Sequence, residues 1–513
     1  GFAEARLPDI AALQAYLAPY LPSPAPITLI SGEAYSRGSF TLTPRRLEGS
    51  ARLSGAAWVT DWQSATRTHR MTSQMQLDLE VNDAQLDGSR LDIGGTRLGW
   101  QLASDARQPS LESRLVLREG RFYQTQGPPS GRFVLEGSVQ RLGFLNTFLP
   151  DAHGLSLSGG GQLVAEGQFA DDRLTAPSRL RVDASPLEVR FLDYQANGRG
   201  ELTAQLTGPE EAQLTLGIPR FRLKRQDDAR AYLEGRHLAL TTTTQAVSRL
   251  VDSQDPRHAT TRISLPVVSV PDLSRYNGYL PDGTGIALHG GEASLSSELV
   301  LKGLEGSGAV TLRAFGAELT LLDQRLKGDL ALDFQLTEGE LEQMRFSADS
   351  SSLRLDNVRR LSGEGHQDAG WWAELGLEDA TLVWQTPLTL EADVNLSLRD
   401  SGLLARLFLA RARDSDWLGR LLSVRDIQGR THLSLARQQL ALNGLALSGG
   451  PLTLLAELTL ADRTANGALY AQLGQLGLGI ELIDREPTLK VLQPRRWFEQ
   501  WRQTRQAAQS LSR

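Results

Sequence analysis

Strict period-two alternation constrains the fold of this chain more than any other feature. The clearest case, LTLEADVNLSL, runs from Leu388 to Leu398: every second residue is Leu, Ala or Val, and the residues between are Thr, Glu, Asp, Asn and Ser. Successive side chains of a β-strand point to opposite faces. Such a segment therefore predicts a strand with one apolar face and one polar face.

The same pattern recurs along the chain, for example at 187–191 and 330–336. Dipeptides that favour tight turns, such as Asn197-Gly198 and Asn443-Gly444, lie among these segments. One-faced strands joined by short turns are typical of antiparallel sheets. We therefore predict a mainly β chain with an antiparallel sheet, a few short amphipathic helices and a C-terminal helix.

A thirteen-residue motif occurs three times at near-constant spacing. YLPSPAPITLISG begins at Tyr20, FLPDAHGLSLSGG at Phe148 and YLPDGTGIALHGG at Tyr279, so the starts lie 128 and 131 residues apart. The proline ends a helix, the alternating apolar pair begins a strand, and the glycines predict a tight turn or a β-bulge. We interpret the motif as a helix-to-strand junction within a repeated unit. The predicted domains are three β repeat units at 1–138, 139–269 and 270–400, a helix plus terminal β segment at 401–493, and a basic amphipathic helix at 494–513.

Helices are predicted at 138–149, 244–251 and 401–422 and in the C-terminal segment. The last of these places Pro494 in its first turn and Trp497 and Trp501 on one stripe. Its basic residues include Arg495, Arg496 and Arg502. A basic helix with tryptophans suits contact with an anionic membrane surface or a partner. The alternative, which we favour slightly, is a helix that covers the last edge of the sheet.

Composition excludes several classes of function. Of the 513 residues 40% are hydrophobic and 22% charged, which is typical of an ordered chain, and the net charge of −6 argues against nucleic acid as a partner. The chain has no cysteine, so disulfides and thiolate chemistry are excluded. No apolar run is long enough to predict a transmembrane helix, and no signal peptide is evident. Because the chain opens without Met, we expect any anchor or signal to lie upstream of it.

No motif predicts catalysis, a metal site or a cofactor. None of the seven histidines forms the spacing of a helical metal-binding pair, and the glycines at 159–161 lack the strand-then-helix context of a phosphate-binding loop. Asp414 and Asp416, with Asp400 nearby, lack the dense ligand spacing of a calcium loop and are interpreted as a solvated helix break. We therefore predict neither an enzyme nor a bound cofactor.

Together these features resemble the AsmA-like superfamily of the Gram-negative envelope, which includes the AsmA, TamB and YdbH types. The resemblance rests on the Tyr/Phe-Leu-Pro helix ends, the Leu-x-Leu-x-Gly-Gly strands and the long leucine-rich strands. It implies an elongated, curled antiparallel sheet with an open hydrophobic groove, located in the periplasm. It also implies an inner-membrane anchor outside this chain, an outer-membrane protein or lipoprotein as a further partner, and movement of phospholipid between the two membranes.

The alternation itself is compatible with this resemblance. At about 10–13 residues per strand and turn, the chain would hold on the order of 40 strands, and one curled sheet of that many would be roughly 190 Å long. The residues predicted to line the groove are Leu330, Leu332, Phe334, Leu390, Val394 and Leu396. Three alternatives remain open: a structural or adhesive β-repeat protein with filled cores, an outer-membrane protein assembly factor that conducts no lipid, and a β-solenoid carbohydrate enzyme.

Overall fold

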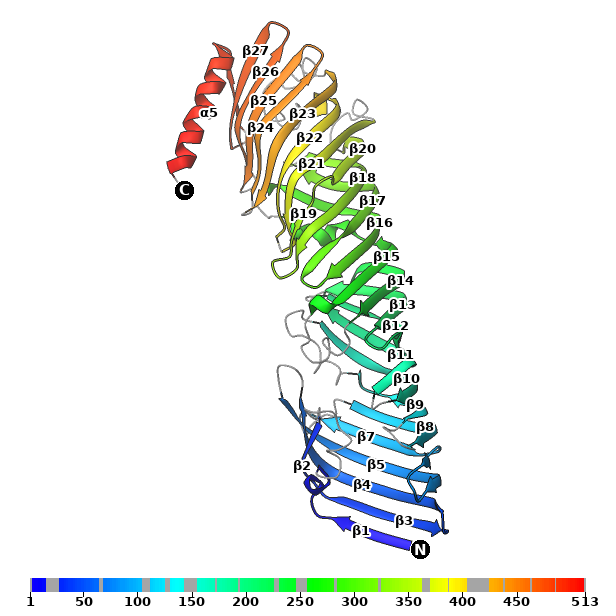
Figure 1. Ribbon diagram of the computed structural model, residues 1–513. Coiled ribbons are helices and arrows are strands. Elements are labelled where there is room, and N and C mark those ends of the chain that lie inside the picture. The colour runs from blue at the N-terminus through cyan, green and yellow to red at the C-terminus, as the bar shows by residue number, and fades with distance from the viewer. Residues whose placement is uncertain are drawn as a thin grey trace. The chain divides into compact units, whose positions relative to one another are not determined.

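The described residues form mainly antiparallel β-strands in the computed structural model (Figure 1). The structure describes residues 2–14, 27–63, 68–103, 111–124, 130–142, 155–170, 173–191, 194–225, 230–245, 256–280, 284–321, 324–361, 370–385, 387–403, 424–436, 439–461, 464–484 and 486–511. The predicted mainly β fold with a large antiparallel sheet and a C-terminal helix is confirmed. The described residues form 28 strands rather than about 40, because single strands reach 19 residues.

Two compact units divide the chain: unit 1 contains Gly1–Ala231 and Gly235–Ile263, and unit 2 contains Tyr232–Glu234 and Ser264–Arg513. The elements of unit 1 are β1 (Phe2–Leu7), η1 (Ile10–Leu13), β2 (Ile27–Ser31), β3 (Ala34–Leu42), β4 (Arg46–Gln63), β5 (Thr68–Gln85), β6 (Arg90–Asp92), β7 (Arg97–Ala103), β8 (Leu111–Tyr123), β9 (Ser130–Val139), β10 (Leu155–Ala170), β11 (Arg173–Phe191), β12 (Tyr194–Leu206), β13 (Ala212–Arg225), most of β14 (Ala231–Thr244), η5 (Pro256–His258) and the first part of β15 (Ala259–Val270).

Unit 2 contains the remaining elements. They are η6 (Leu273–Tyr279), β16 (Ile286–Lys302), β17 (Glu305–Leu321), β18 (Gln324–Glu340), β19 (Arg345–Ser347), β20 (Ser352–Arg360), β21 (Trp371–Val383), β22 (Thr389–Asp400), β23 (Arg425–Ala436), β24 (Gln439–Gly449), β25 (Leu452–Ala461), β26 (Thr464–Leu473), β27 (Leu476–Ile483), β28 (Glu486–Lys490) and α5 (Pro494–Leu511).

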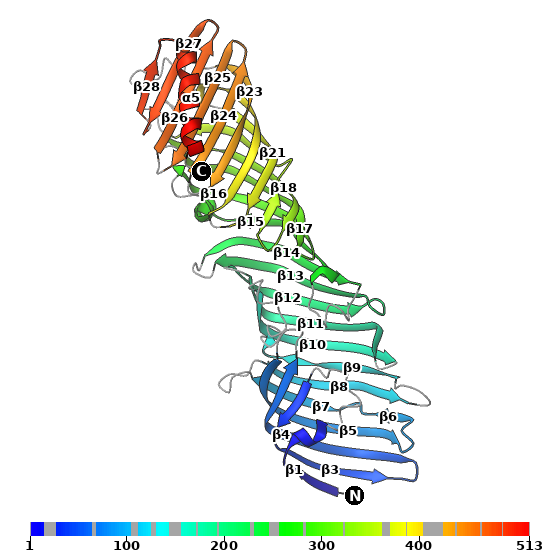
Figure 2. The ribbon, with the colours of Figure 1, turned by 60° about the vertical axis from the view of Figure 1, so that its left-hand side comes forward.

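Strands pair in nearly the order in which they occur along the chain. In unit 1 each strand from β3 to β13 pairs with its successor, except that the short β6 lies beside β5 and β8 while β7 pairs with both (Figure 2). In unit 2 the pairing from β16 to β28 likewise follows the chain, with the short β19 beside β18 and β21. Each long strand therefore lies antiparallel to the one before it in the chain and extends the sheet by one strand.

The repeated motif ends in a β-bulge at each of its three positions. Gly32, Gly159 and Gly291 have φ angles of 138°, 119° and 115°, and the strand register shifts beside each of them. The bulge prediction is thus confirmed. At each position the chain continues in the same direction, within the same strand or into the next one, and does not reverse in a tight turn. A short helix, η6, precedes the third motif as predicted; the helical parts of the first two lie outside the described residues.

The sheet of unit 2 curls strongly. Leu321 of β17 packs against Leu460 of β25 and Ala465 of β26, although β17 and β25 are seven pairing steps apart, which would be about 34 Å in a flat sheet. Near the other end of the strands, the backbone N–H of Leu388 donates to the carbonyl of Tyr279 in η6 at 3.0 Å. Bulges bend the strands that carry them, and register shifts recur throughout these pairings.

The predicted helices agree with the structure to different extents. Helix α5 spans Pro494–Leu511, as predicted. The helix predicted at 138–149 is wrong at its start, because Ser138 and Val139 belong to β9, where they pair with β10. The helix predicted at 244–251 is also wrong at its start, because Thr244 is the last residue of β14. The helix predicted at 401–422 begins at Gly402. Most of the remaining residues of these three predicted helices lie outside the described residues. Among the described residues no helix is long and apolar enough to cross a membrane.

The bulge at Gly159 provides a stability test. A Cβ atom at this position would collide with the carbonyl oxygen of Pro186, and the positive φ is unfavourable for other residues. We expect Gly159→Ala to lower the free energy of unfolding by about 1–3 kcal/mol, measured by urea denaturation. Gly217→Ala in β13 is the matched control, since a Cβ there meets nothing within 4 Å. Equal effects of the two substitutions would contradict this account of the bulge.

Candidate functional site

A continuous row of apolar residues crosses the sheet of unit 1. Its members lie opposite one another on consecutive strands, and we call them the unit 1 row: Leu53, Leu77, Leu98, Leu115, Gly137, Leu163, Val182, Leu202 and Leu216. Every leucine in it is half-buried, whereas Val182 is buried. The row makes eight steps between neighbouring strands, which corresponds to about 38 Å.

Unit 2 carries a second row of the same kind. This unit 2 row consists of Leu295, Leu312, Leu332, Leu353, Leu375, Leu396, Gly429, Leu447, Leu454, Ala471 and Leu478. Its first six members are leucines on six neighbouring strands, and all six are half-buried. Ten steps give it a length of about 48 Å. Both units therefore present aliphatic side chains in a line perpendicular to the strands.

The opposite face of the sheet is charged and wet. In unit 1, Arg52 Nε lies 2.5 Å from Asp78 Oδ1 on the neighbouring strand. In unit 2, Arg313 donates two hydrogen bonds to the carboxylate of Asp333, at 2.9 and 2.7 Å, and these hold the pKa of Asp333 below its usual range. Exposed pairs of this kind contribute little to stability, because water and salt screen them. Their main consequence is that the two faces differ sharply in polarity.

The predicted lining residues lie on two strands of unit 2, β18 and β22. Leu332 and Leu396 belong to the unit 2 row, and Leu330 and Phe334 flank Leu332 on the same face of β18. These four residues and Leu390 are half-buried. Val394 is only 1% exposed, because it packs in a core cluster with Leu336, Ala348, Leu377, Ala380, Leu382 and Ala392. The apolar face of unit 2 is thus filled at Val394 and retains solvent-accessible leucines along the row.

Sequence reasoning missed the unit 1 row altogether. Alternation in segments such as 187–191 indicated strands there, but it could not say which residues of successive strands lie opposite one another. The available signal was the alternation of apolar residues in long strands such as β5, where Met75, Leu77, Leu79 and Val81 occupy every second position. Only the register between neighbouring strands shows that these separate apolar residues lie opposite one another in a row.

Helix α5 packs on the outer face of the sheet over β26 and β27 (Figure 2). Trp497 and Trp501 contact a cluster formed by Ala468, Tyr470 and the buried Phe498, and sequence reasoning did not single out Phe498. Two arginines of the helix also contact the sheet: Arg502 Nε lies 3.2 Å from Glu457 Oε1, and Arg505 donates to Thr459 Oγ1 at 2.7 Å. Arg495 and Arg496 are exposed. The helix covers a face of the sheet rather than only its edge.

The most distinct titratable group on the polar face is His432 of β23. Its Nδ1 lies 2.8 Å from Asp393 Oδ1, and its Nε2 lies 3.3 Å from Glu391 Oε2. The hydrogen bond with Asp393, assisted by Glu391, raises the pKa of His432. No group of three or more His, Cys, Asp or Glu in the described ranges has the arrangement of a metal site.

Comparison of the chain with protein-family models, with curated proteins and with solved structures returns no match.

Paired substitutions separate the filled core from the accessible row. Val394→Asp buries a charge with no partner, and we expect it to lower the free energy of unfolding by more than about 4 kcal/mol. Leu332→Asp places its carboxylate where water can reach it, and the expected loss is about 1–2 kcal/mol. Urea denaturation of both variants measures the difference. Equal losses would mean that the row is as closed to water as the core.

The environment of His432 predicts a pH dependence. A pKa raised in the folded state stabilises the fold fully below the unfolded value of about 6.5, and this contribution disappears as pH rises through the folded pKa. We expect the NMR titration of His432 to give a pKa above 6.5 and Asp393→Asn to move it back toward that value. His432→Gln should abolish the corresponding loss of stability. A wild-type pKa at or below 6.5 would contradict the assignment.

Proposed function

We propose that this chain is a periplasmic, membrane-bridging scaffold of a Gram-negative envelope that conducts phospholipids between the inner and outer membranes. The acyl chains move along the apolar rows while the headgroups stay in water. The observation that carries the proposal is the line of half-buried leucines that crosses consecutive strands in each unit. Exposed apolar surface that continues over many strands is a feature of binding sites rather than of ordinary monomer surfaces.

Energetics support an apolar row as a path for lipid. Each methylene group costs about 0.8 kcal/mol to expose to water, so an acyl chain of about fifteen carbons would face a barrier of roughly 12 kcal/mol. Half-buried leucines on neighbouring strands offer apolar contact in steps of about 4.8 Å. They are interrupted by Gly137 and the buried Val182 in unit 1, and by Gly429 and the buried Leu447 and Ala471 in unit 2. One leaflet contributes about 15 Å to the hydrocarbon core of a membrane. The rows, at about 38 and 48 Å, exceed the length that one acyl chain needs.

This function requires no covalent step, and no residue is assigned a catalytic role or a cofactor. The proposal includes the AsmA-like family, an inner-membrane anchor outside the chain, and an outer-membrane protein or lipoprotein as a further partner. Nucleic acid is not among the proposed partners, because the net charge is −6.

One observation favours a second candidate function. Val394 and its neighbours form a closed apolar cluster, as they would in a structural β-repeat protein with filled cores. In this alternative, the charged outer face of the sheet binds the partner, and the half-buried leucines are simply the outermost residues of the apolar core.

Photo-crosslinking in cells distinguishes the two candidates. Leu163 is half-buried in the unit 1 row, and its neighbour Gln162 is exposed on the other face of β10. A photo-crosslinking amino acid at Leu163 should capture phospholipid, and the same group at Gln162 should not. Val394 is too deeply buried to serve as the main probe. If Leu163 crosslinks only to protein while the variant remains folded, the lipid proposal fails and the structural candidate replaces it.

A further inference from the structure

The apolar face of unit 2 emerges into solvent at one end of β27. Ile480, Leu478 and Leu476 alternate along this strand and share one face. Ile480 is 1% exposed, Leu478 is half-buried and Leu476 is 70% exposed. Because Leu478 is the last member of the unit 2 row, the row ends where its face becomes accessible to water.

Two further exposed aliphatic residues lie at the same end of the sheet. Strand β28 ends at Lys490, opposite Gly479 of β27, and the next residues, Val491 and Leu492, are 67% and 86% exposed. The chain then turns into α5, and Pro494 lies so close to Gly477 that a Cβ there would sit 3.2 Å from Pro494 Cγ. We call Leu476, Val491 and Leu492 the apolar tip.

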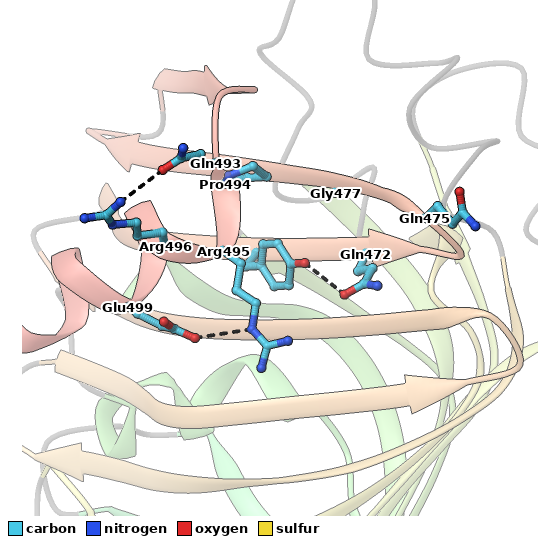
Figure 3. A pocket seen from close by; sticks show the side chains of 9 residues that line it. Gln472, Gln475, Gly477, Gln493, Pro494, Arg495, Arg496 and Glu499 are labelled. Carbon is cyan, nitrogen blue, oxygen red and sulfur yellow. Dashed lines mark hydrogen bonds and ion pairs between the residues drawn. The ribbon is translucent and has the colours of Figure 1, made fainter.

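Cationic side chains stand next to the apolar tip. Arg495 and Arg496 follow it in the first turn of α5, and both are exposed. They border a pocket of about 460 Å³ whose lining also includes Gln472, Gln475 and Gln493 (Figure 3). Arg496 donates to the neutral amide oxygen of Gln493 at 3.5 Å, and Arg495 Nε lies 3.2 Å from Glu499 Oε1. Aliphatic and guanidinium groups therefore occupy adjoining parts of one surface.

We infer that the apolar tip docks on the surface of a membrane that contains anionic lipid. Leu476, Val491 and Leu492 would enter the boundary between headgroups and acyl chains, and Arg495 and Arg496 would meet lipid phosphates. The arginines beside the aliphatic residues favour a negatively charged surface over an apolar protein partner. Trp497 and Trp501 are not the membrane-inserting groups, because they pack on the sheet.

This inference rests on the proposed function and adds a place where lipid enters or leaves. Lipid at this end of the unit 2 row would contact Leu478 and then Leu476 on the same face of β27, beyond the buried Leu447 and Ala471. Docking of the tip would bring that end of the row against a leaflet, so that an acyl chain need not cross water between the protein and the membrane.

Vesicle flotation tests the docking. The full chain is mixed with vesicles of phosphatidylcholine alone or with one third phosphatidylglycerol, and we expect it to float only with the anionic vesicles. Leu492→Asp should weaken this binding at least tenfold, and Arg496→Gln should weaken it severalfold with a smaller dependence on salt. Ile483→Asp is the matched control, because Ile483 is 58% exposed at the opposite end of the same strand. Circular dichroism checks that each variant is folded.

Three outcomes would overturn the inference: no flotation of the wild type, equal loss in the Leu492 and Ile483 variants, or self-association that Leu492→Asp abolishes, which would assign the tip to a second copy of the chain. Crosslinking of lipid at Leu163 is measured on the same variants. If Leu163 captures lipid but the tip does not bind vesicles, only the docking fails. If the tip binds vesicles but Leu163 captures no lipid, the proposed conduction fails and the docking remains.

Discussion

Register between neighbouring strands is the constraint on which the rest of this structure depends. A shift of one residue between two strands moves every side chain of one of them to the other face. The row that crosses those two strands would be interrupted there, and partners such as Arg313 and Asp333 would separate if the shift lay between β17 and β18. Bulges shift the register locally, yet the leucines realign across the next pairing, as Leu295, Leu312 and Leu332 do on β16, β17 and β18.

The two roles of the apolar face compete for the same side chains. Complete burial, as at Val394, stabilises the fold, because each large aliphatic side chain removed from water contributes about 1.5–3 kcal/mol. A half-buried leucine contributes less to stability and retains surface for a ligand. The curl that brings Leu321 against Leu460 closes part of the face in unit 2, while the row through Leu332 keeps its exposure. Within one sheet, the fully buried residues thus contribute most to stability, and the half-buried residues keep apolar surface accessible.

Local patterns predicted strands, bulges and the C-terminal helix, but the predicted turns at Asn197-Gly198 and Asn443-Gly444 are wrong, because these residues lie inside β12 and β24. Alternation identified the strand that contains Leu390 and Leu396, Pro494 marked the start of α5, and the glycines of the repeated motif indicated bulges. Properties that depend on distant residues were not predictable. Val394 and Leu396 are equivalent in the pattern but differ in burial, because Val394 belongs to the buried cluster and Leu396 packs only at its margin. The stripe of Trp497 and Trp501 suited a membrane surface or, slightly better, cover of the sheet edge, and the position of α5 shows that both side chains pack on the sheet.

Pairing in chain order makes the length of each row a matter of how many hairpins the chain contains. Where strands pair only with their predecessor and successor, as β10 to β13 do, a hairpin can be added or removed with new pairing partners only for the two strands that flank it. Each hairpin gained or lost alters the row by about 10 Å. The length of an apolar row can therefore change in increments of one hairpin during evolution.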